Sequence, residues 1–70
     1  MKIESSSGGQ MGDFWGQSYE SFDAAVSAAS EAAQQALAGK TLEWLEVVEF
    51  RGGFNEGRLQ YQVAVRIGYA

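Results

Sequence analysis

A stretch of strict alternation near the end of the chain constrains the fold most. Over residues 58–69, apolar side chains alternate with mostly polar or small ones at a period of two, the pattern of a strand with one buried face. Residues 42–51 are rich in β-branched and aromatic side chains, and the glycine-rich residues 52–57 separate the two segments. Such a joint between two strand-like segments is typical of a hairpin. We therefore expect one β-hairpin over residues 43–69.

The register of this hairpin decides which side chains share a face of the sheet. A three-residue loop, residues 55–57, places Gly57 in the left-handed conformation that glycine tolerates best. A two-residue loop would instead place Glu46 opposite Val65, burying a carboxylate among aliphatic side chains. We favour the three-residue loop, although a bulge at residues 52–53 would alter the count. It pairs Phe54 with Arg58, Phe50 with Gln62, Val48 with Ala64, Val47 with Val65, Glu46 with Arg66, Leu45 with Ile67, and Trp44 with Gly68.

One face of the predicted hairpin combines large apolar side chains with polar ones. Its members are Trp44, Glu46, Val48, Phe50, Gln62, Ala64 and Arg66. A planar heteroaromatic ligand could stack on the indole of Trp44 and form hydrogen bonds in both directions with the amide of Gln62. The alternative is that these side chains fill a subunit interface, where Trp, Phe and Arg are also enriched. The residues alone leave both interpretations open.

The size and composition of the chain limit how it is stabilised. A chain of 70 residues forms a single domain, residues 1–70, with a small core. The sequence has no Cys, His or Pro, so disulfides and a zinc site of the usual ligands are excluded, and oligomerisation is the remaining source of stability. The net charge of −4 without a basic cluster argues against nucleic-acid binding. The chain has neither a membrane-spanning apolar run nor a signal peptide pattern, so we expect a cytoplasmic protein.

The residues before the hairpin predict a supporting strand and helix. Residues 1–8 are expected to be a flexible or atypical N-terminal segment. A short edge strand is expected at residues 10–15 rather than 2–4. Ser18 is the predicted N-cap of a helix from residue 19 to residue 37 or 38, with Gly39 at C′. Its alanine-rich apolar stripe would let it pack closely on a sheet. The expected fold is α+β, with the order β-α-β-β and one helix on a three-stranded antiparallel sheet.

The hairpin resembles the dodecins, a family of small flavin-binding proteins that assemble into hollow dodecamers. The resemblance lies in Leu42-Glu43-Trp44-Leu45-Glu46-Val47-Val48-Glu49-Phe50-Arg51-Gly52 and in Tyr61-Gln62-Val63-Ala64-Val65-Arg66-Ile67-Gly68-Tyr69. The segment Gly16-Gln17-Ser18-Tyr19-Glu20-Ser21-Phe22 is also similar to the start of the family's helix.

This resemblance implies a function and a set of site residues. It implies a homo-oligomer, a dodecamer, that binds riboflavin, FMN or FAD and stores it while quenching its photochemistry. Trp44 would stack on the isoalloxazine ring between neighbouring subunits, and Gln62 would bind its pyrimidine edge. Arg51 matches a position that binds phosphate-bearing ligands in some members, and Glu46 lies beside this site. The roles of Phe14 and Trp15 stay open.

Other function classes remain as alternatives. A structural or interaction oligomer of the same fold would use Trp44 and Phe50 only for subunit contacts and would bind no flavin. A metal-binding variant would rest on Glu43, Glu46 and Glu49. An enzyme is not expected, because no histidine, cysteine or lysine lies beside a plausible pocket, and Glu46 with Arg66 is read as a cross-strand ion pair.

Overall fold

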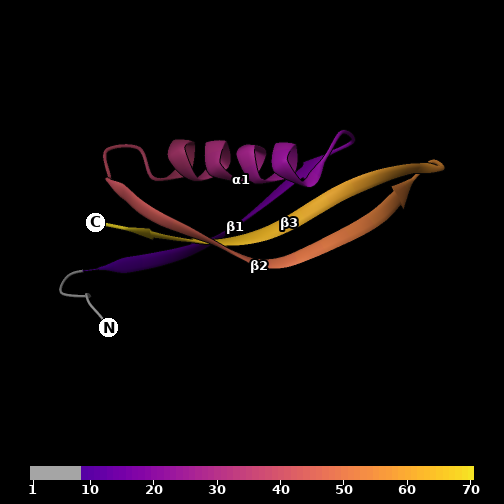
Figure 1. The fold of residues 1–70 in the computed structure, drawn as a ribbon. Coiled ribbons are helices and arrows are strands. Elements are labelled where there is room, and N and C mark those ends of the chain that lie inside the picture. The colour runs from indigo at the N-terminus through magenta and orange to yellow at the C-terminus, as the bar shows by residue number, and fades with distance from the viewer. Residues whose placement is uncertain (1–8) are drawn as a thin grey trace.

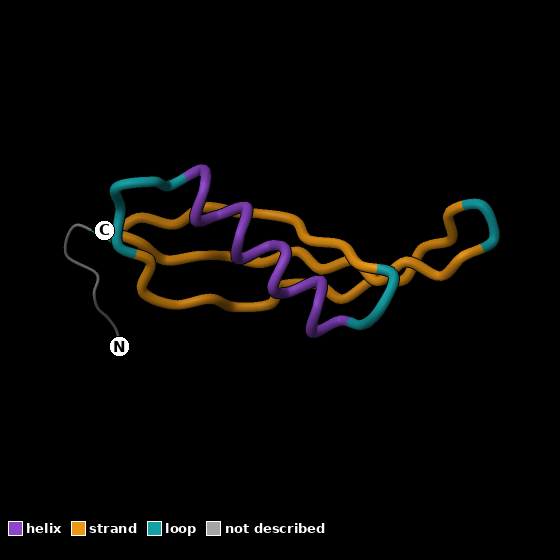
Figure 2. The backbone as a smooth tube through the Cα atoms, turned by 90° about the horizontal axis from the view of Figure 1, so that it is seen from above, coloured by secondary structure: helices purple, strands orange, loops and turns teal. Residues whose placement is uncertain are grey.

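The structure, a computed structural model, describes residues 9–70, which form three strands and one helix. These are β1 (Gln10–Ser18), α1 (Phe22–Ala36), β2 (Leu42–Asn55) and β3 (Arg58–Tyr69). The strands form an antiparallel sheet in the order β1-β3-β2, and α1 lies obliquely across one of its faces (Figures 1 and 2). The predicted α+β fold is therefore confirmed. The segment 1–8 and the alternative strand at 2–4 lie outside the described residues.

Helix α1 begins later than the sequence suggested. The prediction of Ser18 as the N-cap is wrong, because Ser18 is the last residue of β1 and its Oγ accepts a hydrogen bond of 2.9 Å from the Glu20 backbone N–H. Ser21 is the N-cap, and its Oγ accepts a bond of 3.0 Å from the Ala24 N–H. The helix ends at Ala36, and no helix in the described part of the chain is long and apolar enough to cross a membrane.

The core lies between α1 and the central strand. Fully buried alanines of the helix pack against alternate residues of β3, and together they form the cluster Ala25, Ala29, Ala33, Val63, Val65 and Ile67. The backbone of α1 also approaches β1 closely at Gly16, where a Cβ atom would overlap the Ala25 carbonyl oxygen. The small side chains of the stripe thus allow the close helix packing that the alanine content predicted.

The hairpin turn has two residues rather than three. Glu56 and Gly57 both have positive φ, 52° and 80°, which is the conformation of a type I′ turn, and Asn55 pairs with Arg58. The predicted pairing of Phe54 with Arg58 is therefore wrong, because Phe54 pairs with Leu59.

A bulge at Val48 restores the predicted register farther from the turn. The ladder shifts by one residue between Val47 and Glu49, so Val48 has no partner on β3. The predicted pairings of Val48 with Ala64 and of Phe50 with Gln62 are consequently wrong. Beyond the bulge the predicted pairs are confirmed: Val47 with Val65, Leu45 with Ile67, Glu46 with Arg66, and Trp44 with Gly68.

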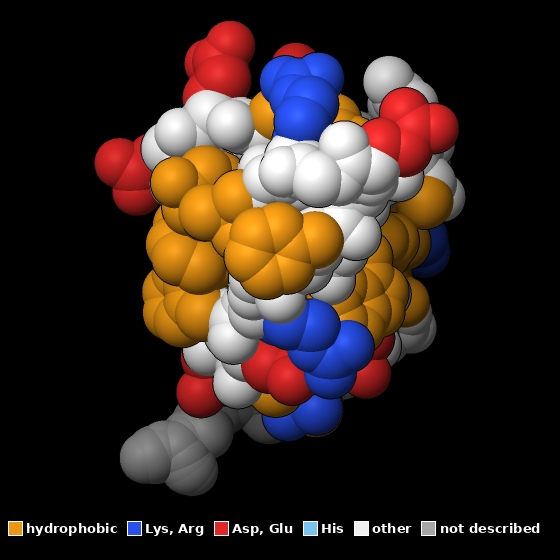
Figure 3. Space-filling model, turned by 90° about the vertical axis from the view of Figure 1, so that its right-hand side faces the viewer, with side chains coloured by type: hydrophobic (Ala, Val, Ile, Leu, Met, Phe, Trp, Pro, Cys, Tyr) orange, Lys and Arg blue, Asp and Glu red, His pale blue; other side chains and the backbone are white. Residues whose placement is uncertain are grey.

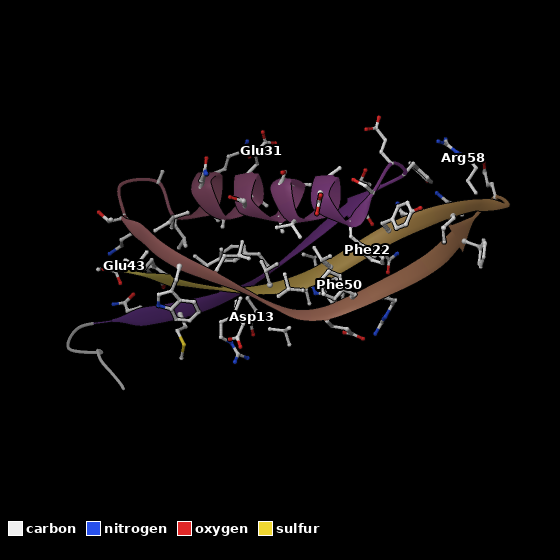
Figure 4. The ribbon with its side chains drawn as sticks, in the orientation of Figure 1. Asp13, Phe22, Glu31, Glu43, Phe50 and Arg58 are labelled. Carbon is white, nitrogen blue, oxygen red and sulfur yellow. The ribbon has the colours of Figure 1, made fainter. Side chains whose placement is uncertain are left out.

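The bulge also moves Phe50 to the face of the sheet that carries α1. Phe50 pairs with buried Val63, and its ring meets that of Phe22 edge to face, with centroids 5.1 Å apart (Figure 4). Phe22 makes a second such contact with Tyr61 at 4.9 Å. Phe50 therefore belongs to an aromatic cluster at the start of α1 and not to the predicted ligand face.

Candidate functional site

The face of the sheet opposite α1, here called the open face, carries the candidate site. Val63, Val65 and Ile67 point toward the helix, so the residues between them on β3 point the other way. Paired residues on neighbouring strands share a face, which gives the open face four rows across β1, β3 and β2. The rows are Met11, Gly68 and Trp44; Asp13, Arg66 and Glu46; Trp15, Ala64 and Glu49; and Gln17, Gln62 and Arg51.

Trp44 lies across the central strand at the position of a glycine. A Cβ atom on Gly68 would overlap the Cε2, Nε1 and Cζ2 atoms of the indole, so the ring occupies the space that a side chain would need. The ring covers Gly68, which is buried, while Trp44 itself stays 46% exposed. The backbone therefore supports the indole from below and leaves part of it open for stacking.

Gln62 and Arg51 form the opposite end of the open face. The two-residue turn and the bulge place them directly opposite each other, whereas the predicted register paired Gln62 with Phe50. The Gln62 Nε2 donates to Gln60 Oε1 at 3.0 Å, and an Arg51 amino group donates to Glu49 Oε2 at 2.8 Å. Sequence reasoning obtained Arg51 from the family resemblance alone, because the bulge that brings it to this face has no signal in the residues around Val48.

The ion pair in the second row differs from the predicted one. Glu46 lies opposite Arg66 as expected, but Arg66 Nε donates to Asp13 Oδ1 of β1 at 3.2 Å. Among residues 9–70 the structure has no ion pair between Arg66 and Glu46. Asp13, which lies on the side of the sheet away from α1 (Figure 4), is thus the partner of Arg66 in place of the predicted Glu46.

Trp44 and Gln62 share a face, as predicted, but lie far apart within one chain. Gly68, the partner of Trp44, is six residues from Gln62 along β3, which corresponds to about 20 Å at ~3.3 Å per residue. A single flat ring cannot contact both side chains of one subunit over that distance. A ligand that stacks on Trp44 and bonds to Gln62 must therefore use residues from two copies of the chain.

Two hollows flank Trp15, a residue whose role the sequence analysis left open. The larger, about 430 Å³, is lined by Trp15, Gly16, Gln17, Ala28, Arg51 and Gln62. The smaller, about 180 Å³, is lined by Asp13, Phe14, Trp15, Val48, Ala64, Val65 and Arg66. The indole of Trp15 is thus a wall common to both hollows. Its position on a longer β1 than predicted, directly opposite Ala64, brings it there.

The carboxylates considered for a metal site were Glu43, Glu46 and Glu49. Within residues 9–70, no three Asp or Glu side chains are grouped closely enough to hold an ion. Glu49 is engaged with Arg51, and Glu43 falls at a second irregularity of the ladder, between Leu42 and Trp44.

Comparison with known proteins identifies the family. The family model described as Dodecin matches residues 11–70. A solved dodecin from Streptomyces davaonensis is 35% identical, with a TM-score of 0.76 and coverage of 87% of this chain and 88% of the other. The tt0972 protein from Thermus thermophilus is 34% identical, with a TM-score of 0.75 and the same coverages. Dodecin from Streptomyces coelicolor is 31% identical, with a TM-score of 0.75 and coverages of 87% and 86%. A search of curated proteins gave no match. The matched family model and these structures establish that the chain belongs to the dodecin family.

Proposed function

We propose that this protein binds flavin and stores it in a sequestered form. One observation carries the proposal: Trp44 lies across Gly68 on the open face, half exposed and supported by the backbone beneath it. An aromatic ring held in this way is pre-organised to stack on a second flat ring, so little conformational entropy is lost when a ligand binds.

The side chains of the open face fit the chemistry of a flavin. When bound, the flavin supplies a planar ring system that absorbs light and exchanges electrons. The carboxamide of Gln62 has both donors and an acceptor for the polar pyrimidine edge of such a ring. Arg51, held by Glu49, lies opposite Gln62 and would bind the phosphate of FMN or FAD. Glu46 lies in the row next to Trp44 and would border the ring.

The site requires an assembly of several subunits. The distance between Trp44 and Gln62 within one chain means that neighbouring subunits would contribute different parts of each site. Large apolar side chains exposed on the single chain would supply the contacts, and Figure 3, which views the hairpin end, shows such side chains gathered in patches between charged ones. They include Met11, Val48, Phe50 and Leu59. We propose the homododecamer of the family.

In this assembly the protein protects flavin rather than using it in catalysis. The indole of Trp44 would quench the excited ring by electron transfer across the stacked contact, and burial would limit access by substrates. The proposed compartment is the cytoplasm.

A fluorescence titration of apo-protein with riboflavin and FMN tests this function. Strong mutual quenching of tryptophan and flavin emission is expected, on material whose mass by light scattering corresponds to a large assembly. The Trp44→Ala variant is expected to lose the quenching while its mass stays unchanged. A large assembly that leaves added flavin fully emissive would contradict flavin storage and support the structural or interaction oligomer instead.

A further inference from the structure

We infer that Trp15 is a second aromatic contact for the ligand. A flat heteroaromatic ring whose polar edge is bound by Gln62 would pack against the indole of Trp15 of the same subunit. This inference rests on the proposed function, in which that ring belongs to a flavin. It assigns to each flavin a tryptophan from β1 in addition to Trp44 from β2.

The register places Trp15, and not Trp44, beside Gln62. Trp15 pairs with Ala64, which is two residues from Gln62 on β3, or about 7 Å along the strand. Trp44 pairs with Gly68, six residues away. Within one subunit, the tryptophan closest to Gln62 along the sheet is therefore Trp15.

The larger hollow has the size and chemistry for a flat polar ring. Its volume, about 430 Å³, lies within the range of roughly 300 to 1,000 Å³ that is typical of small-molecule sites. The indole of Trp15 provides an apolar wall, and the carboxamides of Gln17 and Gln62 provide hydrogen-bonding groups. The small residues Gly16 and Ala28 leave the hollow open.

The indole of Trp15 is held in place but not covered. The guanidinium carbon of Arg51 lies 5.8 Å from the centroid of the ring, within reach of a cation–π contact. Arg51 also forms an ion pair with Glu49 at 2.8 Å. Trp15 nevertheless remains 55% exposed, which is unusual for a large aromatic side chain on a sheet. A ligand ring would cover apolar surface that the subunit leaves in water.

Substitution of Trp15 tests its contribution to affinity. Trp15→Leu is expected to weaken riboflavin and FMN binding by roughly 5- to 160-fold, the range for one flat ring stacked on an aromatic side chain. Trp15→Phe, which keeps a ring, is expected to retain most of the affinity. Phe54→Leu is the matched control, because it removes an aromatic ring that is 80% exposed and lies outside both hollows. It is expected to leave affinity unchanged.

A second measurement tests directly whether the flavin ring lies against Trp15. The chain has two tryptophans, so Trp44→Phe leaves Trp15 as the sole indole. At saturating riboflavin, flavin emission from this variant is expected to stay strongly quenched, because electron transfer from an indole to the excited flavin is fast when the two rings are packed together and falls off steeply with their separation. Emission is expected to recover in the double variant Trp44→Phe, Trp15→Phe. Equal emission from the single and double variants would overturn the inference.

The outcomes separate this inference from the proposed function. If the wild-type protein quenches flavin, Trp44→Ala binds flavin more weakly and Trp15→Leu binds it as tightly as wild type, the storage function stands and the contact at Trp15 is refuted. A loss of affinity in Trp15→Leu that accompanies a fall in assembly mass would also refute it, since Trp15 would then be an interface residue. A wild-type protein that binds no flavin would refute the proposed function itself.

Discussion

The two faces of the sheet are built from different kinds of residues. The centre of the face under α1 consists of alanine and aliphatic side chains that are buried within one subunit, with aromatic side chains packed around them. The open face carries two indoles, Gln62 and several charges, and much of its apolar surface stays exposed. The covered face therefore stabilises the fold of each subunit, whereas the open face is completed only by a ligand or a second subunit. Substitutions on the two faces should accordingly affect different measurements.

The largest expected effect is on the covered face, at Gly16. In Gly16→Ala the new methyl group would overlap the backbone of α1 at Ala25 and Ala29, which cannot rotate away as a side chain can. We expect the free energy of unfolding to fall by about 3 kcal/mol or more, measured by urea denaturation with the assembly's mass monitored.

Gly12→Ala is the matched control for this prediction. Gly12 lies on the same strand and face, but its Cβ would meet only side-chain atoms, the rings of Phe14 at 3.0 Å and of Tyr69 at 3.7 Å, and no backbone. A loss of stability in Gly12→Ala as large as that in Gly16→Ala would show that a side chain added at either glycine of this face of β1 destabilises the fold. The close approach of the helix at Gly16 would then not be the cause.

The next effect is expected on the open face, at Trp44. Trp44→Ala removes the stacked ring, and we expect flavin affinity to fall by about 2 kcal/mol or more, a factor of at least ~30, with little change in the stability of the subunit fold. Isothermal titration with FMN measures the affinity, and far-UV circular dichroism during urea denaturation measures the stability. A large loss of both flavin affinity and stability in Trp44→Ala would contradict the assignment of binding to the open face and of stability to the covered face.

Gly68→Ala should weaken binding while keeping both tryptophans. The new methyl group would occupy the space of the Trp44 indole and push the ring away from the sheet. We expect flavin affinity to fall by about 1 to 2 kcal/mol, less than in Trp44→Ala because the displaced ring can still reach a ligand. The position of the tryptophan emission maximum would report the displacement. Unchanged affinity would mean that the support from Gly68 is not needed for stacking.

The covered face was the more predictable of the two from sequence. The alternation on β3 and the alanine stripe of the helix each report burial directly, so the fold, the strand order along the chain and the packing of α1 follow from periodicity. The start of the helix was misplaced because Ser18 and Ser21 are both good capping residues. Ser18 remains in the strand only because β1 continues to pair with β3 as far as Tyr61.

The open face was less predictable because its geometry depends on a compensating pair of features. A turn one residue shorter than expected and a bulge at Val48 cancel each other, so the pairs near Trp44 were correct and those near Phe50 were not. Two adjacent valines give no indication of which one bulges. As a result, Arg51 and not the predicted Phe50 lies opposite Gln62, so the neighbour of this amide is a cation instead of an apolar ring. The site residues Trp44, Gln62, Arg51 and Glu46 lie on the open face, and their roles toward flavin stay predictions.

The smallest expected effect concerns the partner of Arg66. Both Arg66 and Asp13 are substantially exposed, 42% and 73% in their side chains, so their ion pair is screened by water and contributes about 0.5 kcal/mol at most to the free energy of unfolding. We expect Asp13→Asn to lose this amount and Glu46→Gln to lose less, because Arg66 donates to Asp13 and not to Glu46. A double-mutant cycle with Arg66→Gln, measured by urea denaturation at low salt, isolates each pairwise energy. If Arg66 coupled more strongly with Glu46 than with Asp13, the ion pair predicted from the sequence, Glu46 with Arg66, would be the correct one. This result would also imply that the open face rearranges in the assembly, because Arg66 would then turn from β1 toward β2 and toward Trp44.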